Sequence, residues 1–204
     1  MKKVVIAILV VMLSSCFNSQ TKPATEAIGE QALSQADSLD ALYAVDLLKP
    51  GTPAPELILN DLRGNPRSLS EFRGKKVVLV FWASWCPDCR GEGPELRAMQ
   101  AAADPEKVAF VSVSFDRDFD TLCKYVEDNF LGGVQLFDPA GKKESRAGAD
   151  FGVKWIPSLY LIAEDGKILV STVVAAKIAK ALGTADNDNP GGDAGVCTED
   201  GCSL

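Results

Sequence analysis

Two cysteines separated by two residues stand where a buried strand is expected to end and a helix to begin. They are Cys86 and Cys89, in the segment Trp85-Cys86-Pro87-Asp88-Cys89. Two cysteines on one helical turn bring their Cα atoms within about 5 to 6 Å, the separation that a disulfide requires. This spacing predicts a dithiol pair that forms and breaks a disulfide.

The two thiols are expected to have different roles. Cys86 lies at the N-terminus of the helix, beside backbone N–H groups that lack intrahelical partners, and these groups favour its thiolate. Cys89 lies one turn inside the helix, where it is less exposed and is placed to attack a mixed disulfide between Cys86 and a substrate. We therefore predict that Cys86 is the nucleophile and Cys89 the resolving thiol. The negative charge of Asp88 opposes the thiolate of Cys86, which favours a reductant over a strong oxidant.

Composition excludes several other kinds of chemistry. The 204 residues include 21 Lys and Arg, 28 Asp and Glu and no His, so the formal net charge is −7. An acidic chain without a basic cluster lacks the electrostatic footprint of a nucleic-acid-binding protein. Without His, this chain has no Ser-His-Asp triad, no His-based metal site and no CxxCH haem attachment. We expect no cofactor and no resident metal ion.

Strands and helices are expected to alternate around the cysteine pair. Continuous apolar, β-branched runs predict buried strands over 76–83 and 108–114, the first of which leads to the cysteines. Further strands are predicted over 56–60, 158–163 and 167–174, and helices over 86–103, 119–130, 141–151 and 175–182. This alternation predicts an α/β fold whose sheet is parallel at its centre.

The chain is predicted to divide into four segments. Residues 1–15 have a positive start and an apolar run, the pattern of a signal peptide, and the run is shorter than the roughly 20 residues that a membrane-spanning helix needs. Residues 16–49 are predicted to form a tether, either disordered or containing a docked helix. The compact domain is predicted over 50–183, after which an acidic, disordered tail covers 184–204.

The segment Leu13-Ser14-Ser15-Cys16 resembles the bacterial lipobox, in which the cysteine is lipidated and becomes the mature N-terminus. Several acyl chains, each contributing about 0.8 kcal/mol per buried methylene, would hold the protein firmly at a membrane surface. The resemblance implies a lipid-anchored protein of the bacterial cell envelope, with its domain facing the oxidising periplasm.

The segment VFWASWCPDC, followed by Pro94 and by the segment VKWIPS at 153–158, resembles the thioredoxin superfamily. Within it, the envelope-anchored TlpA-like or ResA-like thiol-disulfide oxidoreductases fit best. Marks of that branch are an anchor, a Pro-rich N-terminal extension, an inserted strand-helix pair and a Glu three residues after the second cysteine, here Glu92. The resemblance covers about residues 50–182. It implies a thioredoxin-like fold, with a central mixed sheet flanked by helices.

The resemblance also implies substrate-binding residues. Pro157 matches the family's cis-proline, which packs against the cysteine pair and presents the backbone of Ile156 to an incoming peptide. The alternative for Pro157 is a trans proline at the start of a strand. Trp85 either shields the disulfide and lines the binding groove or is one more core aromatic. Pro87 is also predicted to be a substrate-binding residue.

Glu92 has two possible roles. Thioredoxins carry a buried Asp six residues before the first cysteine, and this chain has Val80 there. Glu92 is expected to replace that Asp, with burial raising its pKa so that it accepts the proton of Cys89. The alternative is an exposed acid that stabilises the first turn of its helix.

The remaining cysteines lead to separate predictions. Cys123 lies on the apolar face of its helix and is expected to be a buried small hydrophobe. Cys197 and Cys202, in the tail, are expected to form an accessory disulfide that closes a small loop, to serve as a second redox pair or to remain free thiols. A zinc site that combines them with Cys86 and Cys89 is an alternative, which would require the tail to become ordered.

We predict a thiol-disulfide oxidoreductase that reduces protein disulfides in the cell envelope. The resemblance implies apocytochrome c or misoxidised proteins as substrates and a membrane thiol relay as electron donor. One alternative is a peroxiredoxin-like thiol peroxidase, although Ala83 stands where the Thr-x-x-Cys peroxidatic pattern needs Thr. A second alternative is a non-enzymatic Cys-based metal-binding module. A third is an oxidase or an isomerase, and the redox potential of the cysteine pair decides between these roles and that of a reductase.

Overall fold

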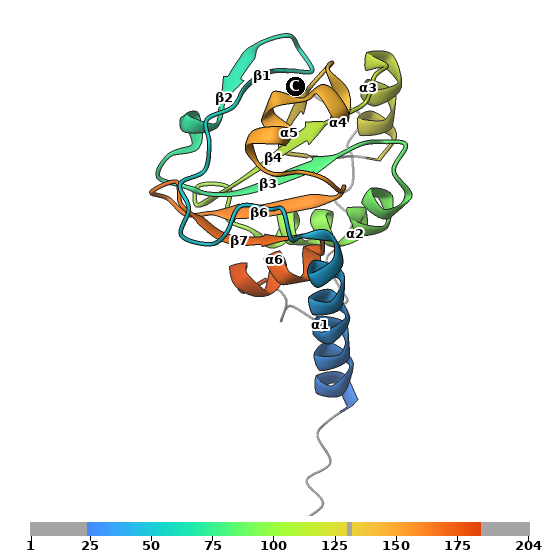
Figure 1. Ribbon diagram of the computed structural model, residues 1–204, viewed down its shortest axis with the longest axis vertical. Coiled ribbons are helices and arrows are strands. Elements are labelled where there is room, and N and C mark those ends of the chain that lie inside the picture. Colours follow the sequence, from blue (N-terminus) through green and yellow to red (C-terminus); the bar gives the residue numbers. More distant parts are fainter. Residues whose placement is uncertain (1–23, 130–131, 185–204) are drawn as a thin grey trace, which may run out of the picture.

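A seven-stranded mixed β-sheet with helices packed against it is the frame of the structure, a computed structural model that describes residues 24–129 and 132–184 (Figure 1). The strands are β1 (Ile58–Asp61), β2 (Pro66–Ser68), β3 (Lys76–Trp82), β4 (Val108–Ser114), β5 (Val134–Phe137), β6 (Ser158–Ile162) and β7 (Ile168–Thr172). The helices are α1 (Ala24–Tyr43), α2 (Pro87–Ala102), α3 (Phe119–Asp128), α4 (Gly141–Glu144), α5 (Arg146–Asp150) and α6 (Ala175–Leu182), with a 3-10 turn over Leu69–Phe72. The strand order is β2-β1-β5-β4-β3-β6-β7. The fold is therefore the mixed α/β fold that the sequence predicts.

Strand β3 lies in the interior of the sheet, and both of its faces are apolar. It pairs in parallel with β4 and antiparallel with β6, and every residue after Lys76 is buried. Successive side chains of a strand point to opposite faces. Phe81 packs against Phe151 on one face, and Trp82 packs against Tyr125 on the other. Helices cover both faces, and the end of β3 delivers the chain to the cysteine pair.

Two predicted elements have the bounds that the structure shows, two short strands were missed, and one predicted helix is divided. The predicted strand over 108–114 and helix over 175–182 have the bounds of β4 and α6. Strands β2 and β5, of three and four residues, are too short to show a hydrophobic period. The helix predicted over 141–151 is divided into α4 and α5 at Ser145, whose side chain accepts a hydrogen bond from Gly148 N and so begins α5.

The segment before the first strand contains a docked helix. Helix α1 projects from the sheet in Figure 1, and its C-terminal end packs beside α6. Ala36, Ala44 and Leu47 are buried, so the packed part of the chain includes residues before Pro50. Of the two alternatives for this segment, the structure has the docked helix. The signal peptide, Cys16 and the tail with Cys197 and Cys202 lie outside the described residues, and the boundaries of tether and tail stay predictions.

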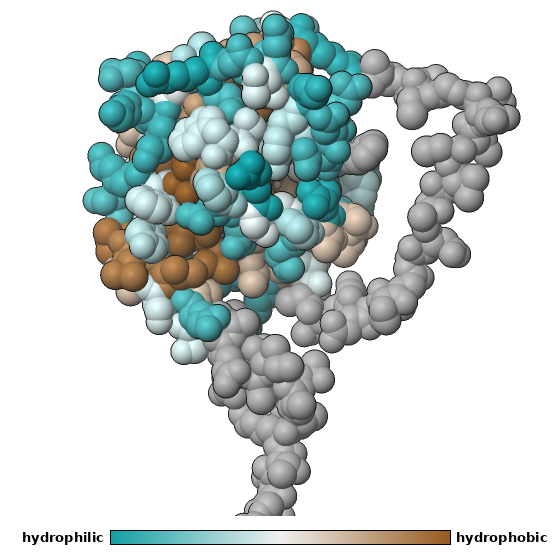
Figure 2. Space-filling view, turned by 90° about the vertical axis from the view of Figure 1, so that its right-hand side faces the viewer, coloured by the Kyte–Doolittle hydropathy of each residue, from teal (hydrophilic) through white to brown (hydrophobic). Residues whose placement is uncertain are grey.

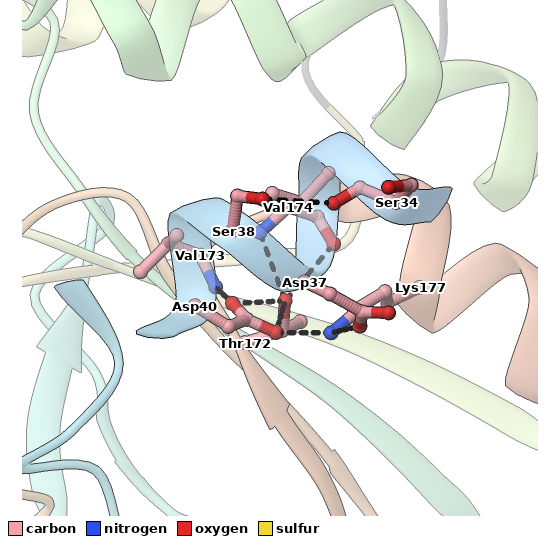
Figure 3. A network of polar contacts seen from close by, with 8 residues as sticks. All are labelled: Ser34, Asp37, Ser38, Asp40, Thr172, Val173, Val174 and Lys177. Carbon is pink, nitrogen blue, oxygen red and sulfur yellow. Dashed lines mark hydrogen bonds and ion pairs between the residues drawn. The ribbon is translucent and has the colours of Figure 1, made fainter. Parts of the chain in front are cut away.

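Asp40 fixes α1 to the turn between β7 and α6 (Figure 3). Its carboxylate accepts hydrogen bonds from Thr172 Oγ1 at 2.8 Å and from Val173 N at 2.9 Å, and it pairs with Lys177 Nζ at 2.6 Å. Asp37 also contacts Lys177 Nζ at 2.6 Å. The side chain of Asp40 is 17% exposed and that of Asp37 is 72% exposed. Because Asp40 is shielded from solvent, water cannot easily replace its polar partners. Asp37 is exposed, so water can replace its contact with Lys177.

Large apolar residues are exposed at several places on the surface. Figure 2 shows one face of the molecule, on which an apolar area interrupts mainly hydrophilic residues. The exposed large apolar residues include several at the end of α1 and just after it: Leu39, Leu42, Tyr43 and Val45. Among these residues, Tyr43 is the last residue of α1.

Replacing Asp40 by Ala is expected to lower the free energy of unfolding by about 1 to 3 kcal/mol, because Val173 N–H and Lys177 lose a shielded acceptor. The matched control is Asp37→Ala, which removes an exposed ion pair from the same lysine and should cost less than about 1 kcal/mol. Chemical denaturation of the two variants measures both values. Equal losses in the two variants would contradict the anchoring role of Asp40.

Candidate active site

Cys86 and Cys89 lie together at the N-terminus of α2. Cys86 is the N-cap residue, and its Sγ accepts a hydrogen bond from the backbone N–H of Cys89 at 3.2 Å. Pro87 occupies the first helical position, where its missing N–H removes no intrahelical bond. Both thiols are free and buried. The structure thus contains two thiols on one helical turn, next to backbone donors that stabilise negative charge on Cys86 Sγ.

The loop before β6 contacts Cys86, the first cysteine of this pair. The Ile156–Pro157 peptide bond is cis, as the family resemblance implies, and both residues are buried. The thiol of Cys86 donates a hydrogen bond to the carbonyl oxygen of Ile156, with an Sγ to O distance of 3.6 Å. Pro157 lines a cavity that Cys89 also lines. The structure therefore brings together Cys86, Cys89, Ile156 and Pro157, which the sequence separates by about seventy positions.

Two exposed tryptophans stand next to these residues in the chain. Trp85 precedes Cys86 and is 56% exposed, and Trp155 precedes Ile156 and is 42% exposed. Trp85 is therefore a surface residue and not a core aromatic. An exposed indole beside a reactive thiol offers a large apolar contact area to a substrate.

A buried carboxylate, which the sequence analysis missed, holds the loop that precedes the cysteines. Asp116 follows β4, and its Oδ2 accepts a hydrogen bond from Ser84 N at 3.0 Å. The hydroxyl groups of Ser84 and Ser114 also donate to this carboxylate, at 2.7 and 2.6 Å. The sequence signal that could have identified Asp116 was an acidic residue two positions after a predicted strand. Because β3 and β4 are parallel, that position lies at the same edge of the sheet as the cysteine pair.

Glu92 is directed toward α6. Its Oε2 accepts a hydrogen bond from Ala175 N, in the first turn of that helix, at 2.7 Å. Burial raises the pKa of Glu92, the bond from Ala175 opposes this, and the charges of Glu95 and Asp88 add to the increase. Glu92 is half-buried, so it is not the exposed acid of the second alternative. Among the hydrogen bonds of the described residues, none joins Glu92 to Cys89.

Cys89 lies beside a cavity of about 50 Å³ between α2 and the sheet. Burial raises the pKa of the Cys89 thiol well above its ordinary value, and the hydrogen bond and charge of Cys86 raise it further. Val80 and Trp82 of β3 form part of the cavity wall, and no described residue that lines it carries a carboxylate. Val80 therefore leaves Cys89 without the buried acid that thioredoxins have at this position, and the cavity is large enough to admit water.

The predictions about metal binding and about the remaining cysteines have separate outcomes. Within residues 24–129 and 132–184 no cluster of three or more Cys, Asp or Glu is placed to hold a metal ion. The accessory disulfide of Cys197 and Cys202 and its zinc alternative lie outside the described residues and stay predictions.

Cys123 is half-buried, so the prediction of a buried residue was wrong. Burial and the charge of Asp120 raise the pKa of its thiol. The described part of the chain has no helix long and apolar enough to cross a bilayer.

Comparisons with known proteins agree with this fold. The sequence profile of the AhpC/TSA family matches residues 50–171. The thioredoxin-like protein YneN of Bacillus subtilis is 32% identical over 124 residues, which cover 59% of this chain and 69% of YneN. The thiol-disulfide oxidoreductase ResA of Geobacillus thermodenitrificans is 28% identical over 118 residues, covering 58% of this chain and 66% of ResA. The thioredoxin domain of a thiol-disulfide oxidoreductase from Bacteroides vulgatus is 26% identical with a TM-score of 0.61, covering 67% of this chain and 96% of that domain.

Replacing Glu92 by Gln is expected to change how stability depends on pH. Because burial raises the pKa of Glu92, the folded protein binds this proton more tightly than the unfolded chain does. The free energy of unfolding therefore falls as pH rises through the range above the ordinary glutamate pKa of about 4.3. Gln keeps an acceptor for Ala175 N–H but does not titrate.

Denaturation of the two proteins from about pH 4 to about pH 8 measures this difference. Wild type should lose stability relative to the Glu92→Gln protein as pH rises. A difference that stays constant over the whole range would show that the pKa of Glu92 is the same in the folded and unfolded states.

Proposed function

The chain belongs to the AhpC/TSA family and shares a thioredoxin-like fold with thiol-disulfide oxidoreductases, and we propose that it is such an enzyme, reducing protein disulfides in the cell envelope. One observation carries the proposal. The two thiols share one helical turn, and the thiol of Cys86 contacts the carbonyl group that precedes the cis-proline. This arrangement gives one sulfur to attack a disulfide and a second sulfur to release the product.

In the first step the thiolate of Cys86 attacks one sulfur of a substrate disulfide. A new S–S bond joins Cys86 to the substrate, the substrate S–S bond breaks, and the other substrate sulfur leaves as a thiolate that takes up a proton. The N–H of Cys89, at 3.2 Å from Cys86 Sγ, stabilises the attacking thiolate. Trp85 and Ile156 border the nucleophile and are the residues that first meet the substrate.

In the second step Cys89 attacks Cys86 Sγ and expels the second substrate sulfur. Two electrons have then passed from the dithiol to the substrate, which leaves as a dithiol, and Cys86 and Cys89 form a disulfide. Because burial raises the pKa of Cys89, this thiol stays protonated until a base accepts its proton. The high pKa keeps Cys89 inactive until the mixed disulfide has formed.

Glu92 is the proposed acceptor of that proton. It lies three positions after Cys89 on α2, so the two side chains project from neighbouring positions of one helix face. Burial raises the pKa of Glu92, and a higher pKa makes its carboxylate a better proton acceptor. The Glu92→Gln protein should therefore reduce disulfides more slowly, and unchanged turnover and thiol titration would contradict this role.

The proposed substrates are disulfide-containing proteins, with apocytochrome c as the specific candidate that the family resemblance suggests. A reductase must itself be reduced again, and a membrane thiol relay is the proposed electron donor. Lipidation of Cys16 would hold the enzyme at the membrane beside such a donor. The alternative of a thiol peroxidase is weaker, because Ala83 is buried and has no hydroxyl group to offer a peroxide.

Single substitutions of the two cysteines test the exchange reaction. The reduced Cys89→Ser protein, mixed with insulin, should accumulate a mixed disulfide at Cys86, because the resolving thiol is missing. The reduced Cys86→Ser protein should accumulate none. Mass spectrometry before and after treatment with dithiothreitol detects the adduct.

Cys123→Ser is the matched control for these variants, since it removes a half-buried thiol on α3. It should turn over insulin as wild type does. Wild-type activity in the Cys86→Ser protein would refute the assignment of the nucleophile, and adducts of equal yield on both single variants would refute the division of roles.

A further inference from the structure

An aromatic pair joins the end of α1 to the loop that carries the cis-proline. The rings of Tyr43 and Trp155 are stacked, with centroids 4.7 Å apart and an interplanar angle of 24°. Tyr43 is the last residue of α1, and Trp155 directly precedes Ile156, whose carbonyl oxygen contacts Cys86 Sγ. A side chain of the N-terminal helix therefore lies against the rim of the active site.

Contacts on both sides hold the two rings in place. Lys142 Nζ lies 6.0 Å from the centroid of the Trp155 ring and donates a hydrogen bond to the carbonyl oxygen of Lys154 at 2.9 Å. One turn before Tyr43, the carboxylate of Asp40 anchors α1 to Thr172 and to Val173 N (Figure 3). Trp155 is thus ordered before any substrate arrives.

The chain that follows α1 packs against the same loop. Leu48 N donates a hydrogen bond to the hydroxyl group of Tyr160 at 3.1 Å, and that hydroxyl donates to the carbonyl oxygen of Phe151. Gly152 has a positive φ of 68°, and a Cβ there would lie 2.0 Å from the carbonyl oxygen of Asp46. This close approach leaves no room for a side chain, so residues just after α1 are held tightly beside the segment that leads to Trp155.

The two rings also remain open to solvent. Tyr43 is 36% exposed and Trp155 is 42% exposed, although each covers part of the other. We call these two residues the aromatic ledge. Residues that flank the reacting cysteine of a substrate reach the ledge within a few positions, because Trp155 is two positions from the cis-proline and an extended chain spans about 3.3 to 3.6 Å per residue.

We propose that the aromatic ledge binds an apolar or aromatic side chain next to the reacting cysteine of a polypeptide substrate. The end of α1 is then part of the substrate-binding surface, and Tyr43 and Trp155 determine specificity. This inference rests on the proposed function. Trp155 precedes Ile156, whose carbonyl oxygen contacts Cys86, so a polypeptide disulfide that reacts with Cys86 would bring its own side chains to the ledge. Binding to a ledge that is already ordered avoids the entropy loss of fixing a side chain on association.

The test compares a large and a small disulfide substrate. Insulin presents polypeptide around its disulfides, and hydroxyethyl disulfide has no side chains to place on the ledge. Tyr43→Ala should lower kcat/KM for insulin about threefold to tenfold, the size of one aromatic contact, mainly through KM. The rate with hydroxyethyl disulfide should change by less than about twofold, as for an ordinary surface substitution.

Three further variants sharpen the comparison. Tyr43→Phe keeps the stacked ring and should behave as wild type with both substrates. Leu42→Ala removes a neighbouring exposed apolar side chain of α1 outside the stack and should also behave as wild type. Trp155→Ala removes the other half of the ledge and should reproduce the selective loss with insulin, and thermal denaturation of each variant verifies its fold.

The possible outcomes separate the ledge from the proposed function. Unchanged insulin reduction by Tyr43→Ala and Trp155→Ala would overturn the ledge and leave the enzyme's activity intact. Equal slowing with both substrates would also overturn it, because the substitution would then act on Cys86 itself. A wild-type protein that reduces neither disulfide would refute the proposed function, and the ledge would fail with it.

Discussion

The contacts of one sulfur atom determine how the rest of the structure is arranged. Cys86 Sγ accepts a hydrogen bond from Cys89 N and donates one to the carbonyl oxygen of Ile156, so it must lie at a helix N-terminus and beside the cis-proline loop at once. Strand β3 meets the first requirement because it delivers the chain to α2, and β6 meets the second because it pairs directly with β3. Through its hydrogen bonds with Ser84, the buried carboxylate of Asp116 holds the short loop that joins β3 to α2.

The N-terminal turn of α6 is the second point on which the arrangement depends. Asp40 of α1 accepts from Val173 N, just before this turn, and Glu92 of α2 accepts from Ala175 N within it. Two carboxylates thus occupy backbone donors at one helix end, where the helix dipole favours negative charge. This turn connects the cysteine-bearing helix to the N-terminal helix, so α1 is part of the architecture that surrounds the active site.

The sequence was sufficient for the features that local patterns encode. The strand over 108–114, the helix over 175–182 and the position of Cys86 and Cys89 on one helical turn were all predicted from the sequence, and the structure has them. Contacts between residues that are far apart in the chain have no local sequence pattern from which to predict them. Thr172 is 132 positions from Asp40, and the partner of Glu92 is 83 positions away, so both depended on knowing the packing of the helices. The stacking of Tyr43 on Trp155 was unpredictable for the same reason.

The reduction potential of the Cys86/Cys89 pair tests most directly the claim that this protein is a reductase. The charge of Asp88 and the burial of Cys89 both disfavour thiolates in the reduced pair, which stabilises the disulfide relative to the dithiol. Equilibration against dithiothreitol or glutathione buffers should give a potential near or below about −250 mV, close to thioredoxin. A value nearer about −120 mV would identify a strong oxidant and contradict the account.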